Sequence, residues 1–283
     1  MKRTVTAFVS LMLAAAFWGC AEDNSSLQSA TESEVHSFSM VTLGDSIAAG
    51  YGLESPEEQR YSALLAQQLT DETVIWQDYN YAVSGDTADE MLKRLENGRA
   101  VRLPSADVIT ISIGANHMLQ PFAAFYGVWL SEDLKASAGT DRAFAEMETA
   151  IAEGLAEFEK QLPLIYEHIT DRNPDAQIIL LTVYNPFAHV EAEITLSDEK
   201  RSLNAYAEEM IGKCNAIIRS FAQQHDAVSV ADIHAAFGEH EKTPVIGQIS
   251  EKNEAYMDPH PNAEGHAIIA EVIGQLITGE NDA

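Results

Sequence analysis

Short, almost continuously apolar segments alternate with helical segments along most of this chain, and this alternation constrains the fold more than any other feature. The strand candidates are Phe38–Leu43, Val74–Val83, Asp107–Ile113, Ile178–Val183 and the shorter Val228–Val230. Apolar strands that are separated by helices are typical of a parallel sheet covered by helices on both sides. The sequence therefore predicts one α/β domain around a central parallel sheet of about five strands.

Four segments show the period of an amphipathic helix. They are Tyr61–Leu69, Ala88–Glu96, Phe144–Ile165 and Leu203–Phe221. In the two longer ones, apolar residues recur every three or four positions, so each helix presents one apolar stripe to the sheet. Pro163 lies inside the third segment, where a proline is expected to kink or break the helix. Cys214 falls on the stripe of the fourth segment, which favours a buried core thiol over a nucleophile.

The first 19 residues have the pattern of a signal peptide. A short basic start precedes the apolar run Val5–Trp18, which is too short to span a bilayer comfortably. The run ends at a glycine followed by Cys20, which resembles a bacterial lipobox, although Phe17 stands where leucine is usual. We therefore expect an exported chain that is lipidated at Cys20 and faces the cell surface or the periplasm. Ordinary secretion, with cleavage after the alanines that end at Ala16, is the alternative.

Residues 20–37 are rich in acidic residues and serine, and we interpret them as a flexible tether to a folded domain at 38–283. The formal net charge of -27 argues against nucleic acid or an acidic membrane surface as a partner. The only membrane contact expected is therefore the N-terminal lipid anchor. Two cysteines cannot build a disulfide framework.

Polar residues follow the predicted strands at positions where ligands bind in such sheets. Ser46 comes directly after the first strand, on a Gly-Asp-Ser turn that can expose its hydroxyl above the sheet. Gly85 follows the second strand and could offer a backbone N–H, whereas Asn116 follows the third and could offer its amide. His260 lies between two prolines near the C-terminus, in a segment that we expect to be a stiff loop before the last helix. The turn is neither a P-loop, since no Lys-Ser/Thr follows the glycines, nor a G-x-S-x-G elbow.

These four residues lie in four short sequence blocks. The order and spacing of the blocks resemble those of the SGNH hydrolases, also called GDSL-type esterases and lipases. The matching residues are Ser46 in Gly-Asp-Ser-Ile, Gly85 in Ser-Gly-Asp, Asn116 in Gly-Ala-Asn and His260 in Asp-Pro-His-Pro-Asn. The resemblance covers about Phe38 to Ile277. It implies a three-layer α/β/α sandwich of the SGNH/flavodoxin-like type.

The last block departs from the family at the position of the catalytic acid. The acid usually lies three residues before the histidine, where this chain has Met257. Asp258, two residues before His260, is the nearest carboxylate and the expected acid, with Glu254 in reserve. A backbone carbonyl could also orient the histidine. In the other blocks, Ile47 replaces a common leucine, and a histidine follows the asparagine where aspartate is frequent.

The resemblance implies acyl transfer from an ester to water. Ser46 would attack the ester carbonyl, with His260 as base and then acid, and with Asp258 holding the imidazole. The backbone N–H groups of Ser46 and Gly85 and the side chain of Asn116 would form the oxyanion hole. This chemistry needs no metal and no organic cofactor. A metal site at Asp258, His260 and His266 is the weaker interpretation, because no other feature supports it.

Two further polar residues and two apolar segments have open roles. Asp45 is expected to bond turn amides, and His117 either lines the pocket or faces solvent. The apolar segment Leu119–Leu130 could form a pocket wall or lid, or pack as core. Residues Phe187–Leu196 could add another wall or form a solvated loop.

Three functions fit these residues. The first is an esterase or lysophospholipase-like enzyme acting on short to medium acyl chains of a small-molecule or lipid ester. The second is a carbohydrate O-acetylesterase, which would act on a glycan ester with the same residues. The third is a non-catalytic surface lipoprotein, which the presence of all four block residues disfavours.

Overall fold

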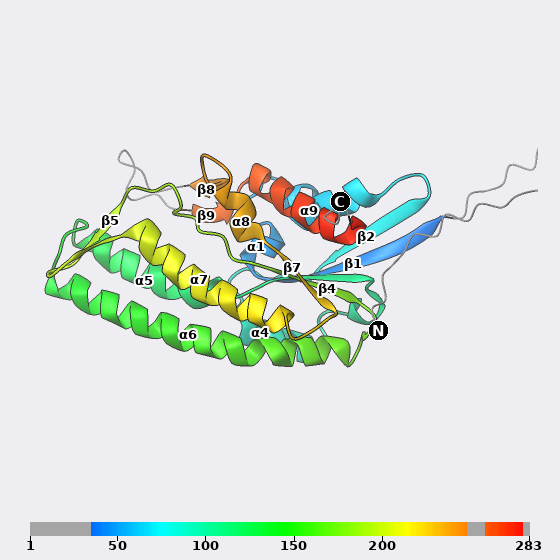
Figure 1. Cartoon of the computed structure of the whole chain (residues 1–283), viewed down its shortest axis with the longest axis horizontal. Coiled ribbons are helices and arrows are strands. Elements are labelled where there is room, and N and C mark those ends of the chain that lie inside the picture. Colours follow the sequence, from blue (N-terminus) through cyan, green and yellow to red (C-terminus); the bar gives the residue numbers. More distant parts are fainter. Residues whose placement is uncertain (1–34, 248–257, 280–283) are drawn as a thin grey trace, which may run out of the picture. The chain divides into compact units, whose positions relative to one another are not determined.

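Five parallel strands form the central sheet of the computed structural model, which describes residues 35–247 and 258–279 (Figure 1). The strand order is β2-β1-β3-β4-β7. The strands are β1 (His36–Gly44), β2 (Val74–Asn80), β3 (Val108–Ser112), β4 (Gln177–Leu181) and β7 (Val228–Ala231). All four pairings are parallel, so the carboxyl ends of the strands lie at one edge of the sheet. The predicted central parallel sheet is confirmed.

Helices cover both faces of this sheet and complete the three layers. One face packs against α1 (Ser46–Ala49), α3 (Tyr61–Leu69), α8 (Ile233–Gly238) and α9 (Ala263–Thr278). The other packs against α4 (Ala88–Glu96), α6 (Ala138–Thr170) and α7 (Leu203–Ala222), with α5 (Asn116–Ser131) against α6. Side chains alternate along β1: Met40 belongs to the core of the first face, whereas Val41 and Leu43 belong to that of the second. This alternation gives both faces of the strand an apolar layer.

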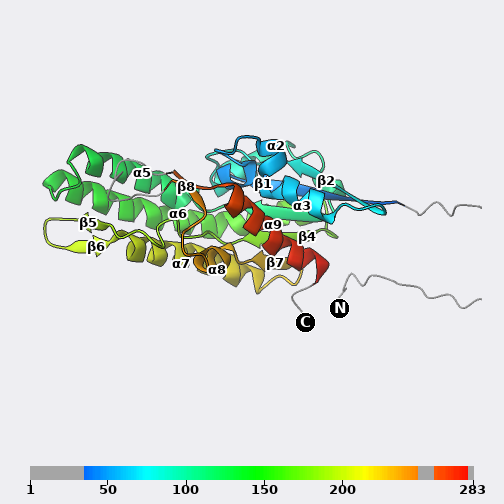
Figure 2. The same cartoon turned by 90° about the horizontal axis from the view of Figure 1, so that it is seen from above.

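Three helices extend beyond the carboxyl ends of the strands. Figures 1 and 2 show α5 and parts of α6 and α7 running past the sheet toward a hairpin of β5 (Glu193–Thr195) and β6 (Lys200–Ser202). The core of this helical extension is aromatic. Phe125 packs against Trp129 and edge-on against Phe144, and all three are almost fully buried. The extension therefore places an apolar wall beside the edge of the sheet where ligands bind.

The remaining short elements are α2 (Pro56–Gln59), the 3-10 turn Leu103–Ser105, β8 (Val245–Gly247) and β9 (Asp258–Pro261). β8 and β9 form a separate antiparallel pair. The segment around His260, expected to be a loop, is thus a strand. Its two prolines are tolerated because a two-stranded sheet consists of edge strands, where a missing N–H need not interrupt a ladder.

Helix α6 continues through Pro163, so the break considered for this position is absent. Proline removes the hydrogen bond to the carbonyl of Glu159, but both residues lie on the exposed side, where water can reach that carbonyl. On the opposite side, Leu162 and Ile165 are buried in the core. Packing before and after the proline therefore holds the helix together.

The N-terminal predictions remain untested. The signal peptide, Cys20 and most of the predicted tether lie outside the described residues, as does Glu254. β1 begins at His36, two residues before the predicted start of the domain. Within residues 35–247 and 258–279, none of the helices has the length and apolar character needed to cross a membrane.

Candidate active site

Ser46 lies directly beyond the carboxyl end of β1, as the first residue of α1. The turn requires glycine at position 44, where φ is +137° and a Cβ atom would lie 2.1 Å from the carbonyl oxygen of Ser112. The Asp45 carboxylate then accepts a hydrogen bond from the Ile47 N–H at 3.0 Å and caps α1. This local geometry fixes the Ser46 side chain at the sheet edge.

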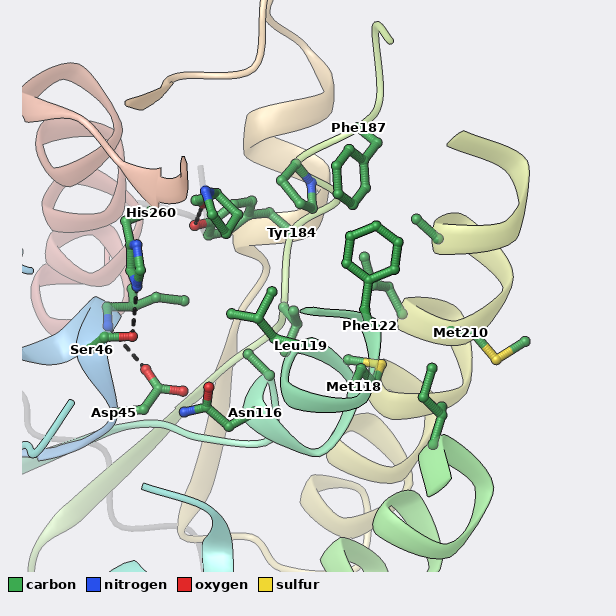
Figure 3. Close-up of a pocket in the computed structure, with 18 of the residues that line it drawn as sticks. Asp45, Ser46, Asn116, Met118, Leu119, Phe122, Tyr184, Phe187, Met210 and His260 are labelled. Atoms are coloured by element: carbon green, nitrogen blue, oxygen red, sulfur yellow. Dashed lines mark hydrogen bonds between the residues drawn. The ribbon is translucent and has the colours of Figure 1, made fainter. Parts of the chain in front are cut away.

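Ser46, His260 and Asp258 form a hydrogen-bonded row, of which Figure 3 draws Ser46 and His260. Ser46 Oγ lies 2.9 Å from His260 Nε2, and His260 Nδ1 lies 2.6 Å from Asp258 Oδ1. The same Asp258 oxygen accepts the backbone N–H of His260 at 3.2 Å. The side chain of Asp258 is 24% exposed and that of His260 is 16% exposed. A serine next to an imidazole that a carboxylate holds can act as a nucleophile.

Two tyrosines hold the strand that carries His260. The Tyr184 hydroxyl donates a hydrogen bond to the carbonyl of Pro259 at 2.5 Å, and the Tyr184 ring packs against Phe237 of α8. The ring of Tyr51, which is 52% exposed, lies 4.5 Å from that of His260 between centroids. Neither tyrosine was predicted as part of the site, because only the fold brings their distant segments to β9.

The Gly85 loop is tied to the asparagine of the third block. Asn116 donates one amide hydrogen to the carbonyl of Asp86 at 2.9 Å, and Gln120 donates to the carbonyl of Gly85 at 3.0 Å. The Asp86 carboxylate is almost fully buried and accepts two bonds from Arg94, at 2.7 and 2.9 Å. Asn116 lines the same pocket as Ser46, whereas Gly85 is not among the residues that line it. One amide hydrogen of Asn116 is left to face a ligand.

Asp45 is a second buried acid at this site. Burial raises its pKa to about 7, and the negative charge of Asp86 adds to the effect, while hydrogen bonds from the backbone oppose it. Its carboxylate bonds a turn amide, as the sequence analysis expected. Near neutral pH, both protonation states of Asp45 are therefore populated.

The two other candidate histidines are structural. His117 neither lines the pocket nor faces solvent: it is buried, and its Nε2 accepts the N–H of Ala88 at the start of α4. His266 is fully buried and accepts the N–H of Tyr61, and burial lowers its pKa to about 4. In the part of the chain that the structure describes, no group of three His, Cys, Asp or Glu residues is placed to hold a metal ion.

A pocket opens beside Ser46 and His260, with about 740 Å³ of space that is partly open to solvent. Beyond its polar end, most of the side chains that line it are apolar (Figure 3). They come from α5 (Met118, Leu119, Phe122), α6 (Ile151), the segment after β4 (Val183, Tyr184, Pro186, Phe187) and α7 (Leu203, Tyr206, Ala207, Met210, Ile211). We call this space the apolar pocket.

Within the segment Leu119–Leu130, some residues form a pocket wall and others pack as core. Leu119 and Phe122 line the apolar pocket, whereas Phe125 and Trp129 are core residues that do not. Phe187 also lines it, which agrees with the pocket wall, one of the two roles considered for Phe187–Leu196. The α7 residues were predicted only as core, because their periodicity does not distinguish a core stripe from a pocket wall.

Comparisons with known proteins bear on the family and the fold of this chain. The model of the GDSL-like lipase/acylhydrolase family matches residues 42–268. The uncharacterized protein YpmR of Bacillus subtilis is 25% identical over 244 residues, which cover 85% of this chain and 82% of that protein. An extracellular lipase from Streptomyces rimosus has a similar structure, with a TM-score of 0.61 and 21% identity over 84% of this chain and 99% of the lipase. A phospholipase A1 from Streptomyces albidoflavus NA297 also gives a TM-score of 0.61, at 17% identity over 84% of this chain and 98% of that enzyme.

Proposed function

Because the chain belongs to the GDSL-like lipase/acylhydrolase family, we propose that it is a serine hydrolase that cleaves carboxylic esters with short to medium acyl chains. The observation that carries the proposal is the row of Ser46, His260 and Asp258 at the mouth of the apolar pocket. The row supplies a nucleophile and its base, and the pocket supplies a site for the acyl group.

In the first step, Ser46 Oγ attacks the carbonyl carbon of the ester while its proton passes to His260 Nε2. The tetrahedral intermediate collapses when the C–O bond to the alcohol breaks and His260 returns the proton to the leaving oxygen. A water molecule then attacks the acyl-serine, and its proton again moves to His260. Ser46 leaves as the hydroxyl, with that proton, and the carboxylic acid is released.

Asp258 and the turn around Ser46 support these steps. The carboxylate accepts the Nδ1–H of His260, which selects the tautomer with a free Nε2 and stabilises the imidazolium. The oxyanion would be bound by the backbone N–H of Ser46, the Asn116 amide hydrogen that Asp86 does not use, and the N–H of Gly85. The Arg94–Asp86 ion pair holds the Gly85 loop in place for this role.

The competing function, carbohydrate O-acetyl hydrolysis, would use the same catalytic residues. An acetyl group needs space for one methyl group beyond the carbonyl. The apolar pocket continues past that point to α7, and the side chains along this stretch are apolar. Its extent favours acyl chains longer than acetyl.

The test is hydrolysis of p-nitrophenyl esters from acetate to palmitate by the purified protein, with Ser46→Ala as the matched variant. We expect activity that peaks between butyrate and octanoate, and a fall of about 10⁶ in kcat for Ser46→Ala. Retention of more than a few per cent of the activity by Ser46→Ala would rule out Ser46 as the nucleophile. Activity on acetate alone would favour the carbohydrate esterase.

A further inference from the structure

We propose that the acyl chain runs from Ser46 into the space between α5 and α7, over Ala207, and that Ala207 sets the chain length that the enzyme accepts. This inference rests on the proposed function and adds the path of the substrate and a residue that determines specificity.

The direction of the path follows from the residues around the apolar pocket. In Figure 3, Ser46 and His260 lie at one end, Leu119, Phe122 and Phe187 lie further along, and Met210 lies at the far end. An acyl group bonded to Ser46 Oγ can therefore extend toward α7 without leaving the apolar pocket.

Ala207 lies at the centre of the wall that α7 contributes. Leu203, Met210 and Ile211, at four positions before it and three and four after it, also line the apolar pocket. Residues at these spacings share one face of a helix. Since alanine ends at Cβ while its neighbours on the face are larger, the wall is recessed at Ala207. The recess is the place on this helix where a chain of methylenes fits.

The opposite wall cannot easily move to close the recess. Phe122 on α5 packs against Phe187 and Tyr126, at 5.4 and 5.8 Å between ring centroids, and it is 7% exposed. Ile151 of α6, which is 2% exposed, lines the depth of the apolar pocket. A larger side chain at position 207 would therefore occupy space that the substrate needs, because the surrounding core is already packed.

Chain length should act on the rate through burial of methylenes. Away from Ser46, Asn116 and His260, the surroundings of the chain are mainly carbon atoms, so each buried methylene raises kcat/KM about fourfold. Met210 is half-buried at the far end, and its unbranched side chain can adapt to the last methylenes. We thus expect a rise in kcat/KM with chain length, followed by a gradual decline.

The experiment compares Ala207→Leu and Ala207→Val with Ala216→Leu, a matched control on the exposed side of the same helix. Each full-length variant is assayed with p-nitrophenyl acetate, butyrate, hexanoate, octanoate and decanoate. In Ala207→Leu, kcat/KM for octanoate should fall about tenfold to a hundredfold, as expected when two or three methylenes lose their place. The value for acetate should change less than about threefold, and Ala207→Val should lie between Ala207→Leu and wild type.

Met210→Ala supplies an independent variant that enlarges the pocket instead of filling it, and it should move the optimum toward decanoate. The acetate activity of every variant reports whether the protein is folded. If Ala207→Val and Met210→Ala keep the wild-type length profile while acetate activity is intact, the path over Ala207 is wrong. A wild-type enzyme restricted to acetate would also overturn it.

These results separate the inference from the function on which it rests. Hydrolysis that depends on Ser46, with an unchanged length profile in the Ala207 variants, refutes only the acyl path. The absence of Ser46-dependent hydrolysis at every chain length refutes the proposed function and the path together.

Discussion

Replacement of Asp258 by asparagine removes the negative charge that lies 2.6 Å from His260 Nδ1 while keeping the shape of the side chain. When His260 takes the proton of Ser46, the imidazolium and the carboxylate form an ion pair with charge centres about 4 Å apart. At the effective dielectric constant typical near a protein surface, this attraction is about 4 kcal/mol, or roughly a thousandfold in rate. The side chains of Asp258 and His260 are 24% and 16% exposed, so water screens part of the attraction between them, as this dielectric constant assumes.

Asparagine adds a second penalty, because its NH₂ group can donate to Nδ1 and select the wrong tautomer of His260. In other serine hydrolases the two effects together reduce kcat by about 10⁴. We therefore expect Asp258→Asn to lower kcat by about 10³ to 10⁴ with little change in KM, because Asp258 does not contact the acyl group.

The assay measures kcat and KM for p-nitrophenyl butyrate from about pH 6 to about pH 9, with thermal unfolding as the check on folding. Glu254→Gln tests the alternative catalytic acid. Asp226→Asn is a control that removes a carboxylate from an exposed position. Both should keep activity close to that of wild type. A folded Asp258→Asn enzyme with kcat within tenfold of wild type would show that another group orients His260. A loss in Glu254→Gln alone would identify that group.

Four further predictions concern other residues. Asn116→Ala should lower kcat for butyrate by about 10²–10³, the usual cost of one oxyanion donor, and an unchanged kcat would remove Asn116 from that role. Asp45 has a pKa of about 7 in the folded protein, above the 3.8 of the free side chain, so the folded state favours its protonated form. The stability of the protein with protonated Asp45 is fully present below about pH 4 and is lost as the pH rises through 7. The Asp45→Asn variant, which keeps the helix cap, should therefore gain about 2 to 3 kcal/mol of stability relative to wild type as the pH rises from 5 to 8 in urea unfolding; a constant difference would contradict this. Burial raises the pKa of Cys214 to about 12, so a thiol reagent should modify it only after the protein is denatured. Cys20→Ser should release the protein from membranes, and a variant that stays bound would exclude lipidation at Cys20 as the anchor.

Much of the fold could be predicted because the periodicities are strong. The ranges Tyr61–Leu69 and Ala88–Glu96 agree residue for residue with α3 and α4, since apolar residues at helical spacing define both. The strands that lead into the first and third blocks were also predicted, because the last residues of β1 and all of β3 are buried and mostly apolar. At Pro163, by contrast, the local preference of one residue was outweighed by packing on both sides of it.

The walls of the apolar pocket could not be predicted in the same way. Phe122 and Phe125 are three residues apart in one aromatic segment, yet Phe122 lines the apolar pocket and Phe125 packs against Phe144 of α6. Which of them meets the pocket depends on how α6, which begins at Ala138, packs against α5. Ala207 carried no signal at all, because a small residue on a helical stripe indicates a recess only when the facing helix is known.

The residues proposed for the chemistry and those proposed for acyl specificity lie on different elements, so kinetics should be able to separate their effects. Ser46 and His260 are held by the β1 turn and by β9, whereas the far part of the apolar pocket is built from α5 and α7. A change at Ala207 therefore leaves the reacting atoms where they are, and it should alter the length profile with the same pH dependence as wild type. A change at Asp258 leaves the acyl walls in place, so it should lower the rate for all chain lengths by one common factor. If Asp258→Asn instead affected octanoate and acetate differently, the acyl chain would have to contact β9, and the path toward α7 would be wrong.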